Sequence, residues 1–222
     1  MLVAGVDDAG RGSVIGPLVI AGVMLKEEDL PKLVELGVRD SKLLSPARRE
    51  LLEVEIKRVA QKYSVIKLSP REIDEVVESG RKFHKLNRLE AQAMAKVIEM
   101  LRPDIAYVDA SDVIESRFKQ HILECLPFKV KIVSEHKADR KYPIVSAASI
   151  IAKVERDREI AELKKTFGDF GCGYPTDAKT IKFLNQCLEK HGGYPDFVRK
   201  SWKPAKIAKS ESEKNSFQKR LL

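Results

Sequence analysis

The sequence predicts an α/β protein with a mixed central sheet flanked by helices. Short apolar runs that are typical of strands alternate along the chain with segments whose apolar residues recur at helical spacing. The first two runs, residues 2–7 and 17–25, follow each other closely, which indicates a mixed sheet rather than a wholly parallel one. A chain of 222 residues with 43% hydrophobic residues is large enough for one substantial core.

The later elements are predicted from caps and spacing. Ser45–Pro46 has the pattern of an N-cap followed by proline at the first helical position, and apolar residues from Leu52 to Tyr63 continue at helical spacing. Ser69–Glu72 has the spacing of a capping box and should open another helix. Strands are also expected over 64–68, 105–109 and 130–134, and helices over about 86–101, near 113–126, over 143–167 and from about 177 to 191.

Composition restricts the class of protein. The formal net charge is +8, and such a basic surface suits a polyanion, most often nucleic acid, although a merely soluble basic protein has the same balance. The three cysteines are odd in number and lack paired metal spacing, which favours reduced thiols and a cytoplasmic protein. We expect no signal peptide and no membrane span, because no basic leader precedes a long apolar stretch.

Four aspartates stand at or near the ends of predicted strands. Asp7 and Asp8 end the first run, Asp109 ends a later run, and Asp139 follows shortly after another. Ligands gather outside strand ends in α/β sheets, so these carboxylates can converge. Such a cluster is unfavourable without a cation, and Mg²⁺ and Mn²⁺ both prefer oxygen ligands. Taken singly, Asp109 and Asp139 are more typical of ordinary turn or N-cap residues.

Six short motifs follow one another along the chain. They are Asp7-Asp8-Ala9-Gly10-Arg11-Gly12, Arg39-Asp40-Ser41-Lys42, Tyr107-Val108-Asp109, His136-Lys137-Ala138-Asp139, Ser146-Ala147-Ala148-Ser149-Ile150 and Gly173-Tyr174-Pro175. This series closely resembles ribonuclease HII, the type 2 ribonuclease H, and in particular its archaeal form. The resemblance covers about residues 1–203 and implies an RNase H-like fold with a mixed central sheet and a helical C-terminal segment.

The resemblance implies a domain arrangement and an activity. A catalytic domain would cover 1–168, a helical segment that packs on it and helps to bind substrate would cover 169–203, and 204–222 would form a polar, flexible tail. The implied activity is metal-dependent hydrolysis of the RNA strand of RNA/DNA hybrids, with cuts 5′ of ribonucleotides embedded in duplex DNA. Such an enzyme leaves 5′-phosphate and 3′-hydroxyl ends and serves DNA replication and ribonucleotide excision repair.

The resemblance also assigns the catalytic acids. They are Asp7, Asp8, Asp109 and Asp139, which would hold two Mg²⁺ or Mn²⁺ ions when substrate is bound. We choose Asp7 as the ligand shared by both ions. Asp8 and Asp109 would then hold one ion, and Asp139 would hold the other or orient the attacking water.

Substrate contacts are assigned in the same way. Gly10, Arg11 and Gly12 would recognise the ribonucleotide and its phosphate, and Tyr174 would contact the sugar next to the cut. The residues themselves, apart from the resemblance, suggest further substrate contacts: Ser41 and Lys42 with backbone phosphates, His136 and Lys137 through their charge, and Arg199, Lys200 and Lys203 with the duplex. The alternative at each position is a solvated turn or a local packing contact.

One position departs from the family pattern. The family has Asp-Glu-Ala-Gly-Arg-Gly, and this chain has Asp8 in place of the glutamate. The charge is kept, but the carboxylate is shorter by one methylene. Because Mg²⁺ demands near-ideal octahedral geometry, we expect a direct ligand to become a water-mediated one. Activity is then expected to survive in weakened form, with a stronger preference for Mn²⁺.

Two other functions stay open at this point. A module that binds hybrid duplex but hardly cuts would also carry these motifs, with Asp8 as the reason for its low activity. A third candidate is another RNase H-like enzyme, such as a DNA recombinase, which should cut an all-DNA substrate. Cleavage of a duplex with one embedded ribonucleotide separates the three.

The C-terminal hexapeptide, Phe217–Leu222, begins like the clamp-binding peptide of replication and repair proteins. Gln218 and Leu221 fit that pattern, but its pair of aromatic residues is missing. Either the match is accidental or the chain stops short of the natural end. A sliding clamp is therefore a candidate partner beside the nucleic-acid substrate, and we expect a monomer.

Overall fold

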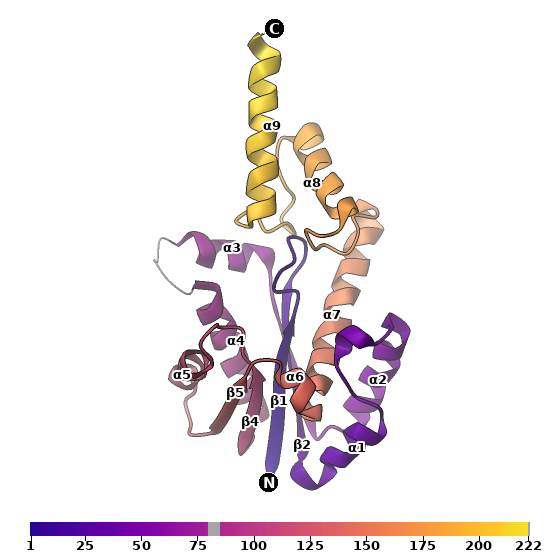
Figure 1. Cartoon of the computed structure of the whole chain (residues 1–222), viewed down its shortest axis with the longest axis vertical. Helices are drawn as coiled ribbons and strands as arrows, with labels where there is room; N and C mark the ends of the chain where they lie inside the picture. Colours follow the sequence, from indigo (N-terminus) through magenta and orange to yellow (C-terminus); the bar gives the residue numbers. More distant parts are fainter. Residues whose placement is uncertain (80–84, 222) are drawn as a thin grey trace. The chain divides into compact units, whose positions relative to one another are not determined.

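The computed structural model describes residues 1–79 and 85–221, with side chains described as far as Lys214 (Figure 1). The chain divides into two compact units. Unit 1 consists of Met1–Ala9, Val19–Lys67 and Lys82–Arg156. Unit 2 consists of Gly10–Leu18, Leu68–Arg81 and Asp157–Leu222. The side chains of the clamp-like hexapeptide lie outside the described residues.

Unit 1 is built around a five-stranded sheet with the order β3-β2-β1-β4-β5. Strand β1 is antiparallel to β2 and parallel to β4, and β4 is parallel to β5, so the sheet is mixed as expected. The central strand β1 therefore delivers its C-terminal end beside that of β4. The strands are β1 (Leu2–Ala9), β2 (Leu18–Lys26), β3 (Lys62–Leu68), β4 (Ile105–Asp109) and β5 (Lys131–Glu135).

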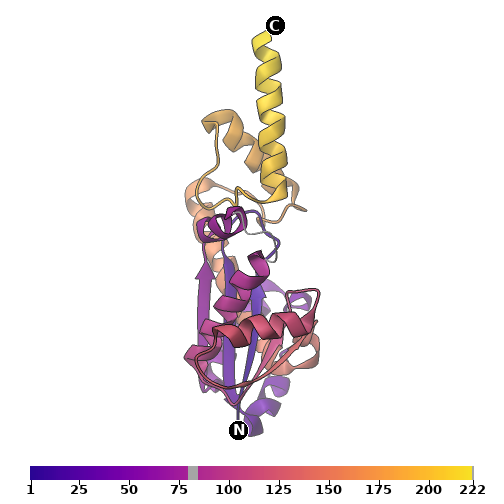
Figure 2. The same cartoon turned by 90° about the vertical axis from the view of Figure 1, so that its left-hand side faces the viewer.

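Helices cover both faces of this sheet. One face carries α1, α2 and the first part of α7, whose apolar side chains form a single core with β1 and β2. The other face carries α4, which packs on β1, and α5, which packs on β5 and α4 (Figure 2). The helical elements are η1 (Glu27–Asp29), α1 (Leu30–Glu35), η2 (Ser41–Leu43), α2 (Pro46–Val59), α4 (Lys85–Leu101), α5 (Glu115–Cys125), α6 (Ala138–Lys141) and α7 (Pro143–Phe167).

The start of α7 lies unusually close to β1. A methyl group on Gly5 would overlap the backbone of Ile144 and Val145, so only glycine fits at this crossing. On the opposite face, a methyl group on Gly22 would overlap the side chain of Val97 in α4. The two glycines thus let a helix approach each face of the central strand pair.

Unit 2 has its own apolar core. Helices α3 (Pro70–Glu78), α8 (Ala178–His191) and α9 (Lys203–Leu221) belong to it, together with the second part of α7 and the loop 10–18. The capping box at Ser69 and Glu72 forms as predicted. Most of the range 204–222, expected as a polar tail, lies in α9. The buried core consists of Val14, Ile15, Ile160, Phe170, Leu184, Val198 and Ala205.

Two element boundaries differ from the prediction. Helix α2 ends at Val59, and Tyr63 belongs to β3 instead of continuing the helix. The chain turns from helix to strand within a few residues there, so the helical spacing of Tyr63 was coincidental. Helix α5 is also shorter than expected, because Val113 and Leu126 lie outside it. No helix in the described ranges is long and apolar enough to cross a membrane.

Candidate active site

Asp7 and Asp8 lie near the end of β1 and point to opposite faces of the sheet, because side chains alternate along a strand. Asp7 faces α7, where the Ser149 side chain hydrogen-bonds its carboxylate. Asp7 is only 4% exposed. Asp8 is half-buried and faces the segment after β4, where the Ser111 hydroxyl lies 3.4 Å from its Oδ1. The backbone N–H of Asp8 donates to Asp7 Oδ1 at 2.7 Å. The peptide link therefore fixes the Asp7 carboxylate from its own strand.

Asp109 ends β4, the parallel neighbour of β1. Its Oδ1 accepts a hydrogen bond of 2.7 Å from the backbone N–H of Ala138, the first residue of α6. This bond ties the short helix α6 to the strand end. Asp139, the fourth acid, directly follows Ala138 and is only 4% exposed. The bond from Ala138 to Asp109 therefore also fixes the backbone next to Asp139.

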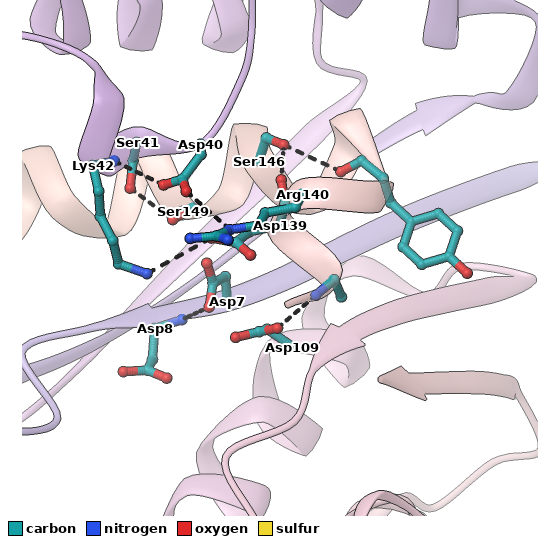
Figure 3. Close-up of polar contacts among 12 residues, drawn as sticks. Asp7, Asp8, Asp40, Ser41, Lys42, Asp109, Asp139, Arg140, Ser146 and Ser149 are labelled. Atoms are coloured by element: carbon teal, nitrogen blue, oxygen red, sulfur yellow. Dashed lines mark hydrogen bonds and ion pairs between the residues drawn. The ribbon is translucent and has the colours of Figure 1, made fainter. Parts of the chain in front are cut away.

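The four carboxylates influence one another electrostatically. Burial raises the pKa of Asp7 well above its ordinary value, and the charges of Asp8 and Asp109 raise it further. Burial also raises the pKa of Asp109 to about 6, with Asp139 and Asp8 acting in the same direction. The N–H of Ala138 opposes this second shift. Strand ends and α6 thus deliver all four acids to one region of unit 1 (Figure 3).

The chemistry of this cluster fits a divalent cation. Carboxylate oxygens are the donors that Mg²⁺ and Mn²⁺ prefer, and a cation would offset the mutual repulsion that raises the pKa values of Asp7 and Asp109. Within the part of the chain that the structure describes, no three acidic, imidazole or thiol side chains stand close enough to form a ready-made metal site.

A basic group lies beside the acids. The Lys42 ammonium in η2 is exposed and 3.8 Å from Asp139 Oδ2, and its charge lowers the pKa of Asp109. The buried carboxylate of Asp40 accepts hydrogen bonds from the Lys42 backbone N–H (3.0 Å) and from Arg140 Nε (3.2 Å). Asp40 therefore holds the Lys42 backbone and the Arg140 guanidinium at the edge of the cluster (Figure 3). A cavity of about 460 Å³ beside them is lined by residues that include Arg39, Asp40, Asp139, Arg140, Lys141 and Ser146.

Two serines of α7 support the site, a role that we did not assign from the sequence. Ser149 contacts both Asp7 and the Ser41 hydroxyl, which lies 2.9 Å away. The Ser146 hydroxyl donates to the backbone carbonyl of Asp139. The three-residue spacing of the two serines on one helix face was the available signal.

The turn before α6 is exposed. Both ring nitrogens of His136 lie near backbone carbonyls, those of Ala110 (3.2 Å) and Val113 (3.3 Å). Lys137 adopts a left-handed backbone with φ of 57° and caps α6. These residues belong to the unit that holds the acids, with Lys137 next to the N–H that binds Asp109.

Unit 2 brings together most of the other substrate-contacting candidates. A Cβ placed on Gly12 would lie 3.9 Å from Cε1 of Tyr174, so the tyrosine ring borders the glycine loop. Gly10 has a φ of 92°, a backbone conformation that favours glycine. Arg199 is fully buried and donates to carbonyls of this loop. Lys200 and Lys203 are exposed, next to it in the chain and at the start of α9.

Comparison with known proteins places these features in a family. A sequence model of the family described as Ribonuclease HII matches residues 4–205. The chain is 50% identical over 208 residues to the Ribonuclease HII of Pyrococcus abyssi, covering 93% of this chain and 90% of the relative.

Solved structures agree. The crystal structure of the ribonuclease H2 from Pyrococcus horikoshii OT3 superposes with a TM-score of 0.89 at 44% identity, covering 97% of this chain and 100% of that one. The structure of the PCNA:RNase HII complex from Archaeoglobus fulgidus gives a TM-score of 0.82 at 46% identity and covers 91% and 96% of the two chains.

Proposed function

Because this chain belongs to the ribonuclease HII family, and is therefore a metal-dependent endoribonuclease, we propose that it hydrolyses the RNA strand of RNA/DNA hybrids. We also propose that it cuts 5′ of ribonucleotides embedded in duplex DNA. The observation that carries both proposals is the cluster of Asp7, Asp8, Asp109 and Asp139, whose charges act on one another in unit 1.

The proposed chemistry assigns each acid a task. Divalent cations, when bound, activate the attacking water and stabilise charge on the phosphate and the leaving oxygen. Asp7 is the central ligand, since it is buried and is held by Ser149 and the Asp8 N–H. Asp8 and Asp109 complete one side of the cluster. Asp139 holds the other side or accepts a proton from the water.

Recognition of the substrate is assigned to two groups of residues. The loop Gly10–Gly12 follows Asp8 after a single residue in the chain, and its glycines allow close approach of a nucleotide to the backbone. Only the 2′-hydroxyl distinguishes a ribonucleotide from its neighbours locally, so this loop is the proposed reader of that group. Lys42 and Arg140 supply positive charge for backbone phosphates; Asp40 holds the backbone of the first and the guanidinium of the second.

A cleavage assay tests the proposal. The substrates are an RNA/DNA hybrid, a DNA duplex with one ribonucleotide and the same duplex without it, each with Mg²⁺ or Mn²⁺. We expect cuts in the first two and none in the third. Binding without cleavage by the unaltered chain would favour the hybrid-binding module, and cleavage of the all-DNA duplex would favour a DNA-cutting enzyme.

A matched pair of variants makes the assay specific to the acid cluster. Asp7→Asn should lower the cleavage rate by about a thousandfold or more, because the central ligand loses its charge. Asp112→Asn changes an equally buried aspartate of unit 1 that binds Arg117 at 2.8 Å. This control should lower stability but leave the rate of the folded enzyme within about threefold. Equal activity of Asp7→Asn and the unaltered chain would overturn the assignment.

We propose a sliding clamp as a second partner, because one of the structural relatives was solved as a complex of PCNA with an RNase HII. The clamp-like residues are Gln218 and Leu221. Titration of the full chain with a sliding clamp should give saturable binding, and Gln218→Ala with Leu221→Ala should weaken it at least tenfold. Unchanged affinity of the double variant would place the clamp contact elsewhere.

A further inference from the structure

Arg199 is a charged side chain with no exposed surface, and within unit 2 it contacts the loop of residues 10–18, which contains Gly10, Gly12 and Gly16. Its guanidinium donates to three backbone carbonyls of that loop. Nη2 donates to Gly10 O at 2.7 Å, Nη1 donates to Arg11 O at 2.9 Å, and Nε and Nη2 reach Gly16 O at 3.2 and 3.1 Å. Burial of a guanidinium is costly unless such bonds compensate it, so the side chain and the loop hold each other in place.

These bonds fix the orientation of two peptide groups. In a trans peptide the C=O and the following N–H point in opposite directions. Because Arg199 binds the carbonyls of Gly10 and Arg11, the N–H groups of Arg11 and Gly12 point to the opposite side of the loop. Successive backbone N–H groups that face the same way suit a phosphate or hydroxyl of a bound nucleotide.

A second residue acts on the same carbonyl. Ser13 is fully buried, and its hydroxyl donates to Gly10 O at 2.9 Å, while its N–H reaches the same oxygen at 3.2 Å. The Gly10 carbonyl thus accepts bonds from Arg199 and twice from Ser13. Such convergence on one oxygen leaves the first peptide of the loop a single orientation.

The remainder of the loop is tied to the same unit. The N–H groups of Val14 and Ile15 both donate to Gly173 O, the residue before Tyr174. The N–H of Arg199 itself donates to Val14 O, and the Arg199 guanidinium stacks 4.9 Å from the ring centre of Trp202. The loop, the tyrosine and the segment that carries Arg199 therefore form one hydrogen-bonded assembly.

We infer that Arg199 is a positioning residue for substrate recognition: it orients the backbone N–H groups of the Gly10–Gly12 loop and does not itself contact the nucleic acid. The inference rests on the proposed function of that loop. This role takes the place of the direct contact with substrate that the sequence suggests for Arg199, because a fully buried side chain cannot reach the duplex. Lysine cannot substitute for it, because only the planar guanidinium offers several donors in a fixed fork.

A binding experiment tests this role apart from catalysis. All variants carry Asp7→Asn, so that hybrid and all-DNA duplexes stay intact during titration. The measured quantity is the ratio of the affinities for the hybrid and for all-DNA duplex. Arg199→Met, which keeps the volume but loses the donors, should lower that ratio about tenfold or more. Amide exchange at Arg11 and Gly12 should become faster in the same variant.

Two further variants keep the test decisive. Ser13→Ala removes one bond to the Gly10 carbonyl, and it should lower the ratio about threefold even if Arg199→Met does not fold. Leu188→Ala is the control, because it removes buried apolar contacts of α8 elsewhere in unit 2. It should lower thermal stability and leave the ratio within about twofold, since a general loss of stability does not reorient the loop.

The outcomes separate this inference from the proposed function. A folded Arg199→Met variant that keeps the parental ratio, or a Ser13→Ala variant that does so where Arg199→Met fails to fold, overturns the positioning role. Failure of the unaltered chain to cut hybrids while it still prefers them overturns the proposed catalysis and leaves the positioning role intact. A parent that shows no preference for the hybrid overturns the role of the loop and this inference with it.

Discussion

The hydroxyl oxygens of Ser41 and Ser149 lie 2.9 Å apart, and their hydrogen bond joins η2 to α7 beside the Asp7 carboxylate. Ser149 also hydrogen-bonds Asp7, so it connects the turn that carries Lys42 to the buried acid of β1. Ser149 therefore holds both the Asp7 carboxylate and the turn that carries the Lys42 cation.

Ser149→Ala should lower the cleavage rate about threefold to tenfold, because it removes the bond that orients Asp7 and favours its charged form. The measurement is the rate at saturating hybrid. Ser41→Ala is the comparison at saturating substrate, since it deletes the bond between the two hydroxyl groups and leaves Ser149 on Asp7. A larger loss in Ser41→Ala than in Ser149→Ala would contradict this order of importance.

Asp109→Asn should stabilise the protein at neutral pH in the absence of divalent ions. The pKa of Asp109 is about 6 in the folded protein against an ordinary value of 3.8. Between these values the folded state holds a proton that the unfolded chain has lost, so the free energy of unfolding falls as the pH rises through this window. Well above pH 6 the full cost is present, about 3 kcal/mol before solvent screening of this half-buried carboxylate reduces it, and asparagine removes it.

Urea unfolding in chelator at several pH values measures this effect. The difference between Asp109→Asn and the unaltered chain should vanish below about pH 4, where the carboxyl is protonated in both states. Asp112→Asn should show the opposite sign, because Arg117 holds the pKa of Asp112 well below its usual range. Equal stability of Asp109→Asn and the unaltered chain at pH 7.5 would show that the charged carboxylate does not destabilise the folded state.

Asp8→Glu should raise activity with Mg²⁺ more than activity with Mn²⁺. The longer side chain restores the reach of the glutamate that the sequence motif leads us to expect here, and Mg²⁺ is the ion with the stricter geometric demand. The comparison needs rates for both proteins with each ion. Activity of the unaltered chain with Mg²⁺ equal to that of Asp8→Glu would show that Asp8 ligates as well as glutamate does.

Asp40→Ala should weaken substrate binding more than it slows cleavage. Its carboxylate holds the Lys42 backbone at 3.0 Å and Arg140 Nε at 3.2 Å, so its loss releases the Arg140 guanidinium and loosens the turn that carries Lys42. We expect KM for the hybrid to rise about tenfold with a smaller change in kcat. Asp29→Ala, which removes only a surface pair with Lys32, should leave both constants unchanged. A fall in kcat alone would instead place Asp40 in the chemical step.

Much of the fold could be predicted from local patterns. The long helix 143–167, the capping box at Ser69 and the mixed sheet all appear in the structure as predicted. These features depend on neighbours within a few residues. Tyr63 shows where such reasoning ends, because it fits the helical spacing of α2 but is part of β3.

The supporting contacts of the site could not be predicted in this way. Ser149 meets Ser41 across 108 residues of sequence, and Arg140 meets Asp40 across 100. The motifs singled out the acids, and the structure places Asp109 and Asp139 beside the pair on β1. The polar residues that hold these acids are brought there by the crossing of helices over strands, and local sequence patterns do not predict such crossings.

The crossing of β1 and α7 at Gly5 has a consequence for engineering this protein. Even one added carbon atom there would drive the Ile144 backbone away from the strand, and Ser149 would move with its helix while Asp7 stayed on β1. Random libraries should therefore lose function at Gly5 although this residue carries no reactive group. Designers who wish to keep activity should therefore leave Gly5 and its contact with α7 unchanged.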